Sequence, residues 1–113
     1  MAFTNTQDAA TIGTTEYSLP NDSTTLTPQT TDVELQAFID FFAMTAGDEY
    51  LWQLKEKINA GTQRLVAHGT IVGVQTTLVV VPSVRLTDGW DLTVKKIAGT
   101  DRSIAWALRY FTL

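Results

Sequence analysis

Short runs of alternating apolar and polar residues, each closed by a turn, follow one another after residue 32. In residues 33–41, 50–58 and 104–110 most alternate side chains are apolar, and Asp88-Gly89 is the strongest of the turn signals. A period of two puts successive side chains on opposite faces of a strand, so that one face is buried and the other solvated. These runs predict an all-β fold, a small antiparallel β-sandwich or jelly roll.

The simple pattern of a half-buried strand is not enough to interpret two segments. Residues 33–42 alternate at period two, but they also fit a helix that Asp32 would cap. We favour a strand because the downstream runs alternate. Residues 78–81 are apolar on both faces, which predicts a buried strand, and Pro82 predicts that its end lies at a bulge or a sheet edge.

Residues 1–31 have a different composition. They hold ten of the nineteen threonines together with Pro20 and Pro28, and they contain few large apolar residues. Threonine favours extended backbone, and proline interrupts a helix. We therefore expect an extended N-terminal arm over 1–31, with a short strand at residues 16–19, and a sandwich domain over 32–113. The arm is either a disordered terminus or a segment that becomes ordered on binding a neighbour.

Composition excludes several classes of function. A chain of 113 residues supports one domain. Its formal net charge of −4 and scattered basic residues argue against nucleic-acid binding. The absence of cysteine rules out disulfides and thiolate metal sites. The first 15 residues do not resemble a signal peptide, and no apolar run is long enough for a bilayer, so we expect a soluble protein made in a cytoplasm.

No group of residues predicts catalysis. His68 is the only histidine, and the spacing of the chain nominates neither a nucleophile nor an orienting acid for it. Acidic residues such as Asp48 and Asp88 occur beside turn glycines, where turn geometry accounts for them. The glycines form no phosphate-binding motif. We therefore expect a non-enzymatic protein with no cofactor, no metal and no small-molecule substrate.

Binding to other proteins is the remaining class of function. The arm is expected to carry most of the contact, by adding strands to a neighbouring sheet edge. The candidate contact residues are apolar side chains in the arm or off the main apolar faces: Phe3, Ile12, Tyr17, Leu19, Leu26, Phe38, Phe42 and Phe111. Because the edges of a small sandwich need covering, we also expect a homo-oligomer, either a dimer or a trimer.

Three stretches carry a resemblance to a known group of proteins. They are Thr15–Pro20, Ala46–Tyr50 with the strand that ends at Glu56-Lys57, and Asp88–Asp91 with the turn over 97–102. This layout resembles small β-sandwich, jelly-roll-like virion proteins of tailed bacteriophages, and it extends from about residue 15 to the end of the chain. These are turn and strand signatures without catalytic residues.

The resemblance implies a structural virion protein of the capsid cement or decoration type. Such a protein binds the outside of the phage head, and its partner is the major capsid protein, whose neighbouring subunits it bridges. Its expected location is the capsid surface of the virion, after synthesis in the host cytoplasm. Two alternatives remain open: a neck, tail or fibre component, and a carbohydrate-binding β-sandwich module that would use exposed aromatic residues.

Overall fold

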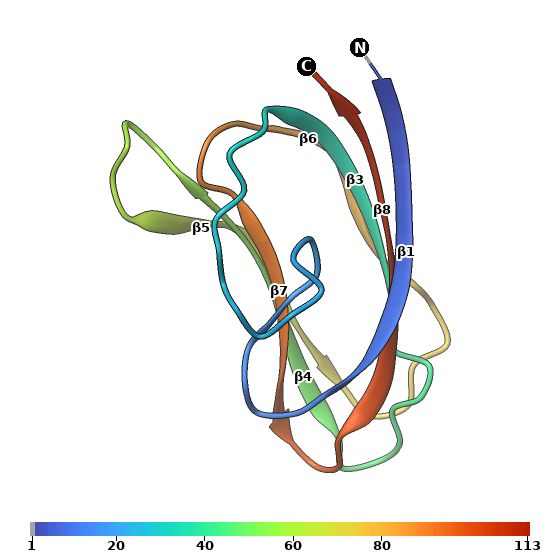
Figure 1. The fold of residues 1–113 in the computed structure, drawn as a ribbon. Helices are drawn as coiled ribbons and strands as arrows, with labels where there is room; N and C mark the ends of the chain where they lie inside the picture. The colour runs from blue at the N-terminus through green and yellow to red at the C-terminus, as the bar shows by residue number, and fades with distance from the viewer. Residues whose placement is uncertain (1) are drawn as a thin grey trace.

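The computed structural model describes residues 2–113, which form eight β-strands and no helix. All pairings are antiparallel, and the strands make two four-stranded sheets packed face to face (Figure 1). The predicted all-β sandwich is therefore confirmed. The strands are β1 (Ala2–Ile12), β2 (Tyr17–Ser18), β3 (Val33–Asp40), β4 (Glu49–Lys57), β5 (Gln63–Val72), β6 (Val79–Leu86), β7 (Asp91–Ala98) and β8 (Arg102–Thr112).

The strand order is that of a jelly roll. Sheet A has the order β1-β8-β3-β6, and sheet B has the order β2-β7-β4-β5. Apart from the β4–β5 hairpin, the chain passes to the opposite sheet after every strand, so nearly every pairing joins segments that are distant in sequence.

The core lies between the sheets and is built by the alternating residues. In β3 the odd-numbered residues Val33 to Ile39 are fully buried while the even-numbered ones are partly exposed. This pattern confirms the strand reading of residues 33–41 over the helix. Trp90 and Trp106 are buried, and Trp52 packs against the core at its margin.

Strand β6 is an edge strand and not a buried one. The register with β3 shifts between the Leu35–Val84 and Ala37–Val81 pairs, which places Pro82 in a bulge as expected. The expectation of a strand buried on both faces is wrong, because Val80 is 46% exposed. Sheet B covers only the inner face of sheet A, so the outer side chains of β6 remain in solvent.

Residues 2–31 are part of the sandwich. Strand β1 pairs with β8 along its whole length, from Ala2–Thr112 to Ile12–Arg102, and the predicted short strand is β2. Ile12 and Leu19 are each only 1% exposed. The expected boundary at residue 32 therefore does not separate an arm from the core, since this segment supplies one edge strand to each sheet. The small number of apolar residues in this segment did not reveal that it forms edge strands, because an edge strand needs few buried side chains.

This placement predicts that Ile12 is a core residue. We expect Ile12→Ala to lower the free energy of unfolding by about 2–5 kcal/mol, because it leaves a cavity between the sheets. The neighbouring Thr11 is exposed, so Thr11→Ala should change it by less than about 0.5 kcal/mol. Urea denaturation followed by tryptophan fluorescence measures both values. Equal stabilities of the two variants would contradict the assignment.

Candidate functional site: the outer face of sheet A

The outer face of sheet A is a continuous surface of paired side chains from four strands. The strand registers bring β1, β8, β3 and β6 side by side, so residues far apart in the sequence lie in the same row. Phe3, Phe111 and Glu34, for example, are cross-strand neighbours. We call this surface the A-face. Its residues are Phe3, Asn5, Gln7, Ala9, Glu34, Gln36, Phe38, Asp40, Val80, Arg85, Ala105, Ala107, Arg109 and Phe111.

Aromatic side chains are exposed on the A-face. Phe3 is 58% and Phe111 41% exposed, and their ring centroids lie 5.2 Å apart. The guanidinium carbon of Arg109 lies 4.4 Å from the centre of the Phe38 ring, a cation–π arrangement. Phenylalanine and arginine are enriched in the cores of protein–protein interfaces.

The charges of the A-face cancel. Arg85 and Glu34 form an exposed ion pair at 3.9 Å, and the other two charged residues are Arg109 and Asp40. Two acidic and two basic side chains sum to zero, whereas the whole chain carries −4. The excess acidic charge therefore lies elsewhere. Balanced charge lets this face approach a partner without net electrostatic repulsion, and exposed rings are enriched in protein–protein interfaces.

Two shallow hollows indent this surface. One, of about 260 Å³, lies between Phe3, Phe111, Arg109 and Glu34. The other, of about 300 Å³, lies beside Phe38, with Leu78 and Ala107 in its lining. Because both open broadly to solvent, they fit protruding side chains of a partner better than an enclosed small molecule.

Three of the predicted contact residues meet on the A-face. Phe3, Phe38 and Phe111 come from β1, β3 and β8, and the sheet brings them together. Arg109 and Val80 belong to the same surface but were not predicted. Their positions on outer faces were readable from the period-two alternation, whereas the order of the strands was not.

The other five predicted residues lie elsewhere. Ile12 and Leu19 are in the core, so their assignment as contact residues is wrong. Tyr17 is half-buried, packs on Trp106 and donates its hydroxyl hydrogen to Asp22. Leu26 and Phe42 are exposed, in the segment after β2 and the turn after β3 respectively.

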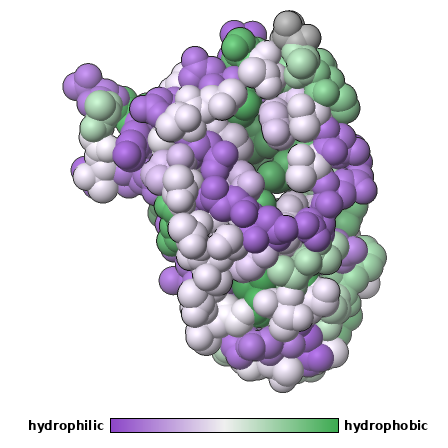
Figure 2. Space-filling model, in the orientation of Figure 1, coloured by the Kyte–Doolittle hydropathy of each residue, from purple (hydrophilic) through white to green (hydrophobic). Residues whose placement is uncertain are grey.

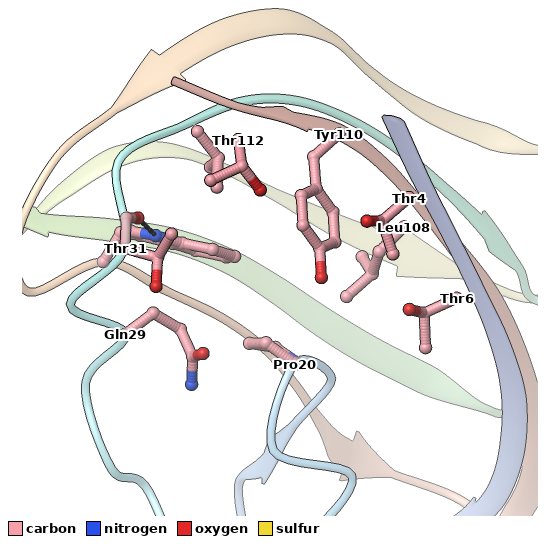
Figure 3. Close-up of a pocket in the computed structure, with 10 residues that line it drawn as sticks. Thr4, Thr6, Pro20, Gln29, Thr31, Leu108, Tyr110 and Thr112 are labelled. Atoms are coloured by element: carbon pink, nitrogen blue, oxygen red, sulfur yellow. Dashed lines mark hydrogen bonds between the residues drawn. The ribbon is translucent and has the colours of Figure 1, made fainter. Parts of the chain in front are cut away.

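A separate hollow opens between the two sheets at one side of the sandwich. It measures about 230 Å³, and Figure 3 shows Tyr110 and Leu108 on one side of it, with Pro20 and Gln29 on the other. Figure 2 shows hydrophobic atoms at its base between hydrophilic rims. Its lining contains threonine hydroxyls but no charged group, and its volume is below that of usual ligand pockets.

One polar cluster attaches the N-terminal segment to sheet B. The Glu16 carboxylate accepts hydrogen bonds from Lys55 Nζ, at 2.8 Å, and from the Thr93 hydroxyl. Burial alone would raise the pKa of Glu16, but these two donors lower it below its usual value. The Ser18 hydroxyl donates to Asp91 at 2.7 Å, and burial raises the pKa of Asp91. These acidic groups are occupied in joining segments of the fold.

A second polar cluster is centred on Asp48, which is buried between β-turns. Its carboxylate accepts hydrogen bonds from the backbone N–H groups of Thr45 and Thr100, at 2.9 and 3.0 Å, and from Arg102 Nε at 2.7 Å. The two backbone donors and the Arg102 guanidinium hold the pKa of Asp48 well below its usual range. With a longer hydrogen bond from the Thr45 hydroxyl, at 3.5 Å, four donors occupy this carboxylate, and it joins the turns before β4 and β8.

The remaining polar residues do not assemble into a reaction centre. His68 is exposed on β5, opposite Gln53. Within residues 2–113 no three metal-ligating side chains cluster, and no helix of a length and apolarity to cross a membrane is present.

Comparison with known protein families, curated proteins and solved structures found no match to this chain. Functional inference therefore depends on its own residues and geometry.

The Asp48 cluster predicts a specific loss of stability in acid. A carboxylate whose pKa is depressed on folding stabilises the fold above its unfolded value, near 3.8, and this contribution is lost as pH falls below that value. We expect the thermal midpoint of the wild type to fall from pH 5 to pH 3 more steeply than that of Asp48→Asn, which is less stable at pH 7. Circular dichroism melts at both pH values measure this difference. Parallel curves for the two proteins would show that Asp48 does not contribute.

Proposed function

We propose that this chain is a non-enzymatic structural virion protein, of the capsid cement or decoration type. In this role it binds the outside of a phage head through the A-face and bridges neighbouring copies of the major capsid protein. The observation that carries the contact function is the A-face itself: a surface of balanced charge with Phe3 and Phe111 exposed and Phe38 half-buried, on a chain of net charge −4.

The fold supports a virion role only by analogy. Jelly rolls recur in viral capsid proteins and in lectin domains, so the architecture is compatible with both. The resemblance of residues 15–20, 46–57 and 88–102 to small phage virion proteins favours the first. The acidic excess outside the A-face also suits a protein assembled on a DNA-filled shell without binding the DNA.

The mechanism of such a protein is mass action. A cement protein that binds only the assembled shell lowers the free energy of that state relative to free subunits. Each contact need not be strong, because many copies act on one particle and each copy touches more than one subunit. Every copy must therefore present the same rigid surface to the capsid, and the outer face of a β-sheet is such a surface.

Two other roles use the same surface. A neck, tail or fibre component would present the same face in far fewer copies per particle. A carbohydrate-binding module is favoured by one observation, the hollow in which aromatic Phe3 and Phe111 lie beside the polar groups of Gln36, Glu34 and Arg109. In that case the rings would stack on a sugar, and the polar groups would bind its hydroxyls.

Copy number separates the virion roles. Quantitative mass spectrometry of purified virions from the source of this chain compares it with the major capsid protein. We expect hundreds of copies per particle for cement. About a dozen copies would place the protein in the neck or tail, and its absence from the particle would refute the virion role.

Substitution of the exposed rings tests the contact surface. We expect the double variant Phe3→Ser with Phe111→Ser to bind capsids that lack this protein at least about tenfold more weakly, which corresponds to about 1.4 kcal/mol. The matched control replaces Ile58 and Val74 with serine. These side chains are 69% and 67% exposed but lie in loops outside sheet A. Co-sedimentation with the particles measures both affinities.

The outcomes of this test are distinct. Equal binding by the two double variants would eliminate the A-face as the contact surface. Loss of binding to a glycan array, with capsid binding retained, would favour the carbohydrate-binding role. Circular dichroism of each variant shows whether the fold is intact.

A further inference from the structure

Three of the four sheet edges carry features that oppose the addition of another strand. Strand β6 has Pro82 in a bulge, and β2 is only two residues long. Strand β5 has a register shift that leaves Val66 without a partner in β4, and it carries the charge of Arg64. Bulges, prolines, charges and short length are the usual protections of an exposed edge.

Strand β1 has one of these protections, the charge of Asp8, and lacks the others. It runs for 11 residues in unbroken register with β8, without proline, lysine or arginine, and Asp8 is its one charged residue. It is one of the two edge strands of sheet A, and Figure 1 shows it beside β8. In the part of the chain from residue 2 to 113, no strand pairs with its other edge. Its backbone therefore offers a free edge for hydrogen bonding.

One hydrogen bond identifies which groups face this free edge. The Ala9 backbone N–H donates to Asp8 Oδ1 at 2.8 Å, so it points away from the ladder with β8. In an unbroken antiparallel ladder the N–H and C=O groups of alternate residues point the same way. Those of Phe3, Asn5 and Gln7 therefore also point outward.

We propose that β1 pairs antiparallel with β1 of a second copy of this chain, about a two-fold axis at Asn5. The two A sheets then form one continuous sheet of eight strands. This axis pairs Phe3 with Gln7 and Thr4 with Thr6, and it is centred on the outward-facing residues Phe3, Asn5 and Gln7. Asp8 of one copy lies opposite Ala2 of the other, so the two carboxylates do not meet.

A second copy fits this edge better than an unrelated strand for two reasons. The first is closure: since the β6 edge is blocked by Pro82, each sheet adds a strand only at β1, and pairing stops at two copies. The second is the register: it pairs the odd-numbered residues of β1, which lie on the A-face, with one another. The A-faces of the two copies therefore lie on the same side of the joined sheet. The dimer thus presents one extended neutral surface. This inference does not depend on the proposed function.

The mass of the protein in solution is the first test. Sedimentation equilibrium should give a particle of twice 12.4 kDa that dissociates on dilution. We expect Asn5→Pro to be monomeric with an unchanged circular dichroism spectrum, because it removes an outward N–H that β8 does not use. Should Asn5→Pro unfold, Asn5→Lys provides the same readout by placing two positive charges at the axis. A wild-type monomer up to about 1 mM would overturn the proposal.

Cross-linking is the second test and locates the contact. The chain has no cysteine, so each variant carries a single thiol. Across the axis the two Asn5 Cα atoms should lie about 5.5 Å apart, within the range of a disulfide. Asn5→Cys is therefore expected to form a covalent dimer under mild oxidation. The control, Thr70→Cys on exposed β5, should not. Equal cross-linking of both variants would place the contact elsewhere and refute pairing through β1.

Discussion

The pairing of the two ends of the chain holds this jelly roll together. Strand β8 lies between β1 and β3, and it contributes Ile104, Trp106 and Leu108 to the core. Strand β1 joins sheet A only through β8, the last strand, whereas β3 also pairs with β6. Folding therefore requires contacts between residues about a hundred positions apart, which makes it slow compared with that of a helical domain of similar size.

A single hydroxyl connects this pairing to the opposite sheet. Tyr50, on β4, donates its hydroxyl hydrogen to the Ile12 carbonyl at 2.7 Å and accepts from the Arg102 N–H at 2.8 Å. Asp48 binds the turn before β8 from the same side. The chemically conspicuous residues Asp48 and Tyr50 thus hold the turns of the fold, and the surface that we propose for a partner is the outer face of sheet A.

The sequence predicted the class of fold because alternation and turns are local properties. Residues 33–41 could be identified as a strand, and Pro82 as a bulge, without any knowledge of their partners. Strand order is not local, so nothing in the segment 78–81 revealed that Val80 would lie at an open edge. The residues of the proposed contact surface were predicted in part: Phe38 was conspicuous on a polar face, whereas Arg109 became relevant only when the register placed it over that ring. Ile12 and Leu19 were misjudged because a polar segment hid two buried side chains.

The ends of β1 and β8 lie side by side, with Ala2 opposite Thr112 (Figure 1). For protein engineering this means that a short linker can join them while new ends open at the exposed β4–β5 turn near Asn59, a circular permutation that keeps every strand in its sheet. It also means that an affinity tag or fluorescent fusion at either end sits at the same corner, beside Phe3 and Phe111. A fusion partner placed there would shield the exposed rings, so tags for binding assays belong at that turn.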